Sequence, residues 1–183
     1  AWAVDPAALV EVLGGRGISP VQTQYFNENS VWYSERVAEA WPQRDQQRAR
    51  ELVQSYVNDP DRSDGLPVGT PISLELMCLP EQSLQDLAQM YQALWNAVGF
   101  DVRLRQVEQA TQIQSVISGD YMTTCWRTSN EQDPYITLNN DFGPVDIQPL
   151  NYTNFTHPLI EEKLAILRTE PDFEIRKAAV EDI

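Results

Sequence analysis

The sequence predicts an α/β fold: a small mixed sheet with a parallel β-α-β-α-β core, flanked by helices, with the core at residues 71–126. Apolar residues alternate along 72–78 and again along 100–104, the pattern of strands with one buried face. Between these stretches, apolar residues recur at helical spacing along 84–98, which indicates an amphipathic helix. Two consecutive β-α-β units imply parallel strands joined by right-handed crossovers.

Residues 1–57 are expected to form a helical lead-in to this core. A first helix is predicted to begin at Asp5–Pro6, because Asp is a favoured N-cap and Pro is favoured at the first helical position. A second helix is predicted from Asp45, its N-cap, to Val57. Its apolar face is expected to comprise Ala49, Leu52, Val53 and Tyr56. A surface loop rich in turn-forming residues follows at 58–71.

Within the core, Ser83 is the expected N-cap of the helix over 84–98, and Gly99 is expected to stop that helix. A shorter helix is predicted over 111–118, and a third strand over 120–126. If the first strand lies between the other two, the ends of the first and third strands are neighbours.

Cys78 and Cys125 are the only cysteines, and both fall at the carboxyl ends of predicted strands. A disulfide is within geometric reach if the sheet has this strand order, but a sequence cannot place two Cα atoms within bonding range. Two buried free thiols are the favoured expectation, and a bridged pair is the alternative. The spacing matches no zinc-binding pattern.

The remainder of the chain is predicted to be a long loop at 127–156 followed by carboxyl-terminal helices at 157–183. A loop of this length in a compact domain is usually either functional or poorly ordered. The first of these helices is expected to begin at His157–Pro158, with Ile160, Leu164 and Leu167 facing inward. No internal repeat or clear hinge divides the sequence, so we expect 1–183 to be a single lobe.

The net charge of −14 argues against a nucleic-acid partner, because phosphate contacts need clustered Lys and Arg. It also argues against electrostatic docking to anionic lipid. No stretch approaches the roughly 20 apolar residues of a membrane-spanning helix.

Both ends of the sequence lead us to expect a piece of a longer chain. It has no initiating Met and no basic leader, and its last ten residues have the pattern of a helix that continues. The lack of a leader here therefore carries no information about the compartment.

No catalytic motif is present, so we expect a protein that is not an enzyme and has no cofactor or bound metal. His157 is the only histidine, and its place beside a proline at a helix start suits an N-cap better than a general base. Paired carboxylates such as Glu161–Glu162 fall on solvated faces. No phosphate-binding loop, nucleophile elbow or dinucleotide fingerprint occurs.

Ligands of parallel sheets bind beyond the carboxyl ends of the strands, and here the third strand ends at an aromatic residue followed by polar ones. An aromatic platform with polar groups beside it suits a small or peptide-like ligand. The candidate ligand-binding residues are Trp126, Arg127, Ser129, Asn130, Glu131 and Asp133. The alternative for Trp126 is a residue at the rim of the core.

A set of motifs that spans nearly the whole chain resembles one family. In order these are DPAALVEVLGG, WPQRDQQRARELV, PISLELMCLPEQSLQDLAQMYQALWNAVGFDVRL, SGDYMTTCW followed by DP, and NYTNFTHPLIEEKLAILRTEPDFEIRKAAVED. The set resembles the carboxyl-terminal lobe of the extracytoplasmic solute-binding proteins of peptide- and nickel-type ABC importers (family 5). Each motif alone is weak, and the ordered set is more specific.

This resemblance implies a periplasmic-binding-protein-like type II lobe, one half of a two-lobed clamp. Such a clamp captures an oligopeptide or similar small solute and delivers it to the permease subunits of an ABC transporter. The implied location is extracytoplasmic, either periplasmic or as a cell-surface lipoprotein of a bacterium. Contact with the membrane is then made only through the anchor of the parent protein.

The sequence departs from the peptide-binding members at one position of the site. Where those members have an Asp that anchors the amino group of the ligand, this chain has Ser129, and the spacing from Trp126 to Asp133 is one residue longer. Glu131 is a candidate to replace that Asp, and Arg127 a candidate to pair with a ligand carboxylate. A sugar, a modified peptide or another solute therefore stays open as the ligand.

Two other functions fit the same residues. One is a sensor in which this lobe is joined to a DNA-binding or signalling domain. The other is an α/β enzyme whose catalytic residues lie outside this segment. A signal peptide with a lipobox cysteine in the parent protein would favour the importer, and a helix-turn-helix would favour the sensor.

Overall fold

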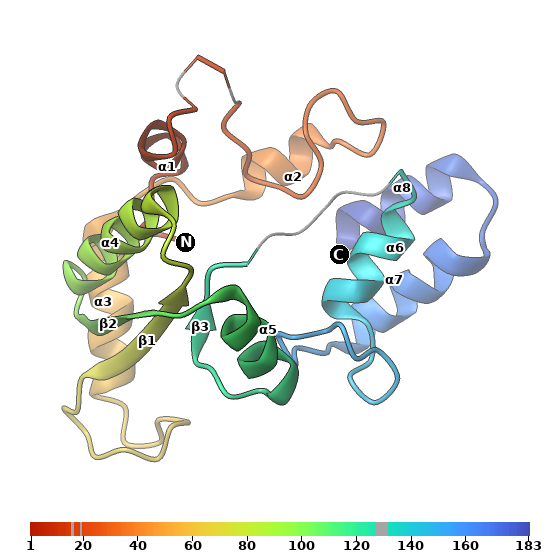
Figure 1. Ribbon diagram of the computed structural model, residues 1–183. Helices are drawn as coiled ribbons and strands as arrows, with labels where there is room; N and C mark the ends of the chain where they lie inside the picture. The colour runs from red at the N-terminus through yellow and green to blue at the C-terminus, as the bar shows by residue number, and fades with distance from the viewer. Residues whose placement is uncertain (16, 19, 127–131) are drawn as a thin grey trace. The chain divides into compact units, whose positions relative to one another are not determined.

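The computed structural model describes residues 1–15, 17–18, 20–126 and 132–183. Within them it has three strands, β1 (Ile72–Cys78), β2 (Phe100–Gln106) and β3 (Thr123–Thr124), and eight helices. The helices are α1 (Pro6–Val12), α2 (Glu35–Ala40), α3 (Gln46–Val57), α4 (Gln82–Asn96), α5 (Gln109–Ser118), α6 (Pro134–Phe142), α7 (Pro158–Thr169) and α8 (Phe173–Asp182). Figure 1 labels these elements.

The chain separates into two compact units. The first unit comprises Ala1–Val21, Trp41–Ser115 and Asp120–Trp126, and the second comprises Gln22–Ala40, Val116–Gly119 and Arg127–Ile183. Each unit has a hydrophobic core of its own.

The first unit is built on a three-stranded sheet in the order β2-β1-β3, with both pairings parallel. Figure 1 shows β1 in the middle position. Leu76 pairs with Leu104 of β2 and with Thr123 of β3, so the predicted parallel pairing is confirmed and the first strand lies between the other two. The described sheet is parallel rather than mixed, and β3 is much shorter than the predicted strand over 120–126.

The amphipathic stripe of α4 covers this sheet as predicted, with Ala88 buried against Leu76, Cys78 and Val102. The expected cap at Ser83 is wrong, because the helix begins before that residue, with Glu81 as an N-cap that makes no side-chain hydrogen bond. Gly99 follows the helix with a φ of 108°, and a Cβ there would lie 3.1 Å from Cγ1 of Val53. Any L-residue would be strained at this close approach.

The first two caps of the lead-in are confirmed. Asp5 accepts hydrogen bonds from the backbone of α1, and Asp45 accepts one from Arg48 N of α3. The predicted inner face of α3 is partly wrong. Leu52 is 43% exposed, and the buried residues of α3 are Ala49, Val53 and Val57.

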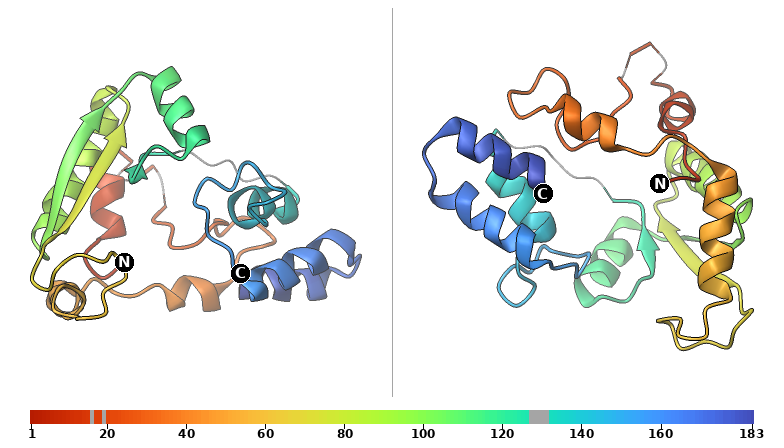
Figure 2. Two further views of the ribbon diagram at one scale, coloured as in Figure 1. Left: turned by 90° about the horizontal axis from the view of Figure 1, so that it is seen from below. Right: turned by 180° about the vertical axis from the view of Figure 1, so that it is seen from behind.

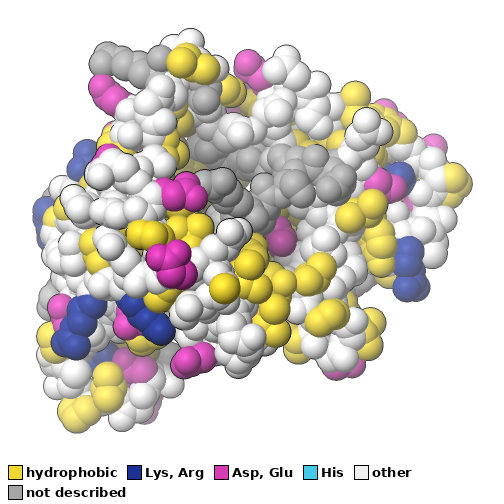
Figure 3. Space-filling view, in the orientation of Figure 1, with side chains coloured by type: hydrophobic (Ala, Val, Ile, Leu, Met, Phe, Trp, Pro, Cys, Tyr) yellow, Lys and Arg dark blue, Asp and Glu magenta, His cyan; other side chains and the backbone are white. Residues whose placement is uncertain are grey.

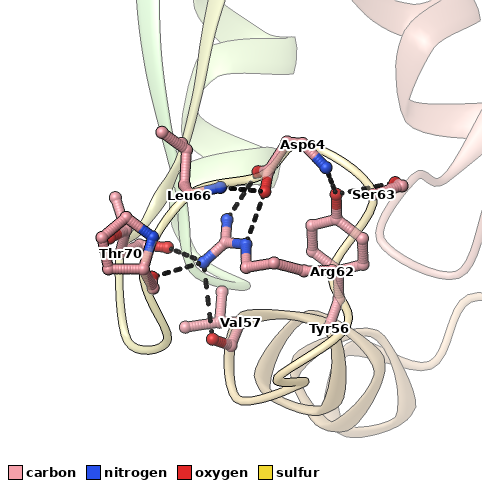
Figure 4. Close-up of polar contacts among 8 residues, drawn as sticks. Tyr56, Val57, Arg62, Ser63, Asp64, Leu66 and Thr70 are labelled. Carbon is pink, nitrogen blue, oxygen red and sulfur yellow. Dashed lines mark hydrogen bonds and ion pairs between the residues drawn. The ribbon is translucent and has the colours of Figure 1, made fainter.

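The loop after α3 closes around the buried guanidinium group of Arg62, whose side chain is 1% exposed (Figure 4). Its Nε and Nη2 each donate to a carboxylate oxygen of Asp64 at 2.7 Å. Its Nη1 donates to backbone carbonyl oxygens of Val57, Pro67 and Thr70. These bonds lower the pKa of Asp64 from its ordinary value of 3.8, chiefly because Arg62 donates to the carboxylate. The Arg62 side chain is thus a structural link between the loop and the start of β1.

Cys78 and Cys125 form a disulfide, with their Cα atoms 5.0 Å apart. The expectation of free thiols is therefore wrong. The reason lies in the register of the sheet, because Met77 pairs with Thr124 and the next residue of each strand is a cysteine. Only the strand pairing brings the two positions within bonding distance.

The second unit is helical. Figure 2 shows α6, α7 and α8 packed together. The predicted inner face of α7 is confirmed, since Ile160, Leu164 and Leu167 are all buried in the core of this unit. The other buried members of that core are Phe26, Trp32, Leu138 and Ala179.

The expected loop at 127–156 is partly wrong, because α6 occupies its middle. Asp133 caps this helix by accepting from Tyr135 N, and Pro134 takes the first helical position. The helix buries Leu138 and Thr137, a face too short to show a clear period in the sequence. After α6, the buried amide of Asn151 donates to carbonyl oxygens of Gly143 and Phe155 and closes the turn before α7.

Candidate ligand-binding site

The carboxyl end of the sheet in the first unit is the first candidate site. All the described strands are parallel, so Cys78, Gln106 and Thr124 end at the same edge. The backbone continues this alignment, because Val107 N donates to Cys78 O at 3.1 Å and Cys125 N donates to Met77 O at 2.8 Å. Ligands of parallel α/β sheets bind at such an edge.

The residue before Trp126 is held at this edge by several contacts. The preceding residue, Cys125, is fixed by its hydrogen bond to Met77 and by the disulfide to Cys78. Its carbonyl oxygen also accepts from Nε2 of Gln112 on α5, at 2.7 Å. Trp126 itself is 42% exposed, and it follows directly after Cys125 with its three contacts.

Hydroxyl groups of β3 strengthen the same edge. Thr123 Oγ1 donates to Glu75 O at 2.8 Å, and Thr124 Oγ1 donates to Met77 O at 3.0 Å. A strand of two residues makes few ladder bonds, and these side-chain bonds add to them. The sequence indicated the position of Trp126 but not the residues that hold it.

The other predicted site residues fall in two groups. Arg127, Ser129, Asn130 and Glu131 lie outside the residues that the structure describes. Asp133 belongs to the second unit, where it caps α6 and accepts from Nη2 of Arg176 at 2.6 Å. These contacts give Asp133 a structural role whether or not it also contacts a ligand.

The start of α6 is held by a second anchor, which includes Trp32. The indole Nε1 of Trp32 donates to Gln132 O at 3.1 Å, and its ring lies 5.0 Å from that of Phe173. The guanidinium carbon of Arg176 lies 5.4 Å from the centroid of the Trp32 ring, a cation–π distance. Sequence reasoning missed Trp32, because it lies in an irregular segment 100 residues before its hydrogen-bond partner.

The second unit also contains a pocket of about 200 Å³, which was not predicted from the sequence. Aromatic and aliphatic side chains line most of it, among them Tyr25, Phe26, Trp32 and Phe142. The Tyr25 hydroxyl donates to Asp141 at 2.9 Å. Burial, together with this bond, raises the pKa of Tyr25, and burial also raises the pKa of Asp141. The pocket thus has a mainly apolar wall with a neutral tyrosine.

Two further features of the described residues concern metal binding and the single histidine. Over that part of the chain, no group of His, Cys, Asp and Glu could hold a metal ion. His157 caps α7, its Nδ1 accepting from Leu159 N at 3.2 Å, which is the predicted role.

The surface charge and the helices are relevant to two other kinds of partner, nucleic acid and the membrane. On the face drawn in Figure 3, the described acidic and basic side chains are scattered among hydrophobic and other ones. They form no broad basic patch there, such as phosphate backbones require. Among the described helices, none combines the length and the apolarity needed to cross a bilayer.

The chain has the lobe fold of periplasmic binding proteins, and the solved structures that it resembles are substrate-binding proteins of peptide and nickel ABC transport systems. No protein-family model and no curated protein matches the sequence. The structural likeness therefore confirms the predicted resemblance at the level of the fold.

Three of these structures define the likeness. The oligopeptide-binding protein AppA from Bacillus subtilis, in complex with a nonapeptide, has a TM-score of 0.82 at 16% identity, over 100% of this chain and 37% of that one. The periplasmic binding protein DppA from Helicobacter pylori, in complex with the peptide STSA, has a TM-score of 0.80 at 15% identity, over 98% of this chain and 33% of that one. NikA from Staphylococcus aureus, in complex with Ni(L-His)2, has a TM-score of 0.77 at 14% identity, over 99% of this chain and 36% of that one. The chain spans about a third of the length of these proteins.

Proposed function

We propose that this chain is the carboxyl-terminal lobe of an extracytoplasmic substrate-binding protein of an ABC importer. The protein captures an oligopeptide or similar small solute and delivers it to a membrane permease, and it is not an enzyme. The observation that carries the proposal is the fold match, which extends over nearly the whole chain at TM-scores of 0.77 to 0.82.

The proposed ligand-binding residues start at Trp126, where the sheet edge supplies a rigid aromatic platform. A partly exposed indole on a fixed backbone loses little entropy when a ligand packs on it. Arg127, Ser129, Asn130 and Glu131 are proposed as the polar groups that follow this platform in the chain. Asp133 is proposed to support them, because it holds the first turn of α6.

These side chains favour a peptide as the ligand class. Arg127 is suited to pair with a carboxylate and Glu131 with an amino group, the two charged ends of a peptide. The peptide complexes of AppA and DppA favour the same class, and Ser129 leaves a modified peptide or sugar as a narrower alternative.

The test is a binding screen on the two-lobed protein that this proposal requires. Isothermal titration calorimetry with tri-, penta- and nonapeptide mixtures, with an oligosaccharide mixture and with a nickel–histidine complex would identify the ligand class. We expect micromolar or tighter peptide binding that Trp126→Ala weakens at least tenfold. Trp2→Ala is the matched control, because Trp2 is 37% exposed and far from the strand end in the sequence. Equal affinities of the two variants would reject the site, and a protein that binds none of the probes would reject the function.

A further inference from the structure

Gln112 is a buried amide that the proposed function leaves without a role. It lies on α5 with 4% of its surface exposed. Its Nε2 donates to Thr124 Oγ1 at 2.9 Å and to Cys125 O at 2.7 Å. An amide nitrogen has two hydrogens, so both are directed at the end of β3.

The bond to Cys125 O bears directly on Trp126. The carbonyl of Cys125 and the nitrogen of Trp126 belong to one planar peptide group. A hydrogen bond that fixes this carbonyl therefore fixes the plane from which Trp126 leaves the strand. The Cys78–Cys125 disulfide holds the same residue by its side chain, and Met77 O holds it by its N–H.

We infer that Gln112 is a positioning residue for the ligand-binding edge and that the disulfide shares this task, so that the placement of Trp126 depends on the oxidation state of Cys78 and Cys125. The inference rests on the proposed function for its effect on affinity, but the placement of Trp126 can be measured without a ligand. Both contacts act on Cys125 and not on the ligand, since Gln112 bonds the carbonyl of this residue and the disulfide holds its side chain.

The redox step is an exchange with a dithiol. A thiolate attacks one sulfur of the Cys78–Cys125 bond, and the second thiol of the reductant then closes its own disulfide. Two electrons and two protons pass to the protein, which gains two thiols. Cys125 is the more exposed of the two cysteines, since Cys78 is only 2% exposed.

The test uses the 183-residue chain labelled with fluorotryptophan and observed by fluorine NMR. The chain has five tryptophans, and Trp126→Phe assigns the signal of interest. Gln112→Glu keeps the shape of the side chain but replaces its donor with an acceptor-only carboxylate at neutral pH. Gln109→Glu makes the same change at the exposed start of the same helix and is the control.

We expect Gln112→Glu to shift or broaden the Trp126 signal and to leave the other four in place, and Gln109→Glu to change none. Dithiothreitol is expected to move the Trp126 signal in the unsubstituted protein and to move it further in Gln112→Glu. In the reduced variant both the Gln112 hydrogen bond and the disulfide are lost, and both act on Cys125. An unchanged Trp126 signal in Gln112→Glu would overturn the inference.

A second variant decides the case in which Gln112→Glu disturbs all five signals. Gln112→Met has a similar length with neither charge nor donor, and its Trp126 signal is then the one to compare. For affinity, we expect Gln112→Glu to weaken nonapeptide binding by the two-lobed protein roughly tenfold, within the range for the loss of buried hydrogen bonds such as those to Thr124 Oγ1 and Cys125 O. If the unsubstituted protein binds none of the probes named for the proposed function, that function fails, while the fluorine signals still decide the placement of Trp126.

Discussion

Opening the Cys78–Cys125 disulfide is expected to lower the free energy of unfolding by about 4 kcal/mol. The two cysteines are 47 residues apart, so the bond closes a long loop in the unfolded chain. The loop-closure relation gives an entropy loss of about 14 cal/mol/K for that length, which amounts to about 4 kcal/mol at 25 °C. This loss destabilises the unfolded state and so stabilises the fold.

The assay is equilibrium unfolding in urea, followed by circular dichroism, with and without a dithiol. The double substitution of Cys78→Ala and Cys125→Ala should lose the same amount and roughly 1 kcal/mol more, since Cys78 is buried. Reductant should not affect the double variant, which makes that variant the control for other effects of the reagent. The slope of the urea dependence should rise on reduction, because the open chain exposes more surface when it unfolds.

Two results would refute this reasoning. One is a change of less than about 1 kcal/mol on reduction, a quarter of the entropy estimate. The other is a count of two reactive thiols in protein that was unfolded without reductant, which would show that the bond does not form.

Three further predictions concern ligand binding by the isolated chain, its stability in acid and the packing of α7. The isolated chain should bind the nonapeptide mixture far more weakly than the two-lobed protein, because closure of both lobes around the ligand is a hinge motion, and nanomolar binding in calorimetry would contradict this. In acid, the unsubstituted protein should lose its advantage in unfolding free energy over the Asp64→Asn variant. The lowered pKa of Asp64 stabilises the fold fully above the ordinary value of 3.8, and this stabilisation is lost as pH falls below 3.8 and through the lowered pKa. Urea unfolding at a series of pH values measures the difference between the two proteins, and a constant difference would exclude the ion pair as its source. In α7, Leu164→Ala should cost about 2 to 5 kcal/mol and Leu159→Ala, at a 43% exposed position, under about 1 kcal/mol in the same assay, and equal costs would contradict the packing.

Much of the fold could be predicted from local sequence patterns. The stripe of α4 and the alternation of β2 each depend on residues close in the chain, and both are confirmed. The alternation predicted for β1 is partly wrong, because the central strand buries Met77 as well as Leu76 and Cys78. The caps at Asp5, Asp45 and His157 are local as well, because a cap bonds to backbone two or three residues away. The parallel direction of the strands followed from the two consecutive β-α-β units.

Apolar patterns that span fewer than about two helical turns were not sufficient to predict a helix or its first residue. Helix α6 was predicted as loop, because its buried face has few residues and its N-cap resembles a turn. Ser83 was a better cap by residue type than Glu81, but the helix starts where the chain leaves β1, a choice made by packing on the sheet.

The sequence by itself determined the class of fold and the place of Trp126 after a strand, because periodicity and the succession of elements along the chain need only neighbouring residues. The tertiary structure alone decided that Cys78 and Cys125 are bonded, that Gln112 holds the carbonyl of Cys125, and that Arg176 pairs with Asp133. The physical reason is distance. Each of these contacts joins residues from different elements, and a hydrogen bond or disulfide forms only where packing brings the atoms within about 3 Å.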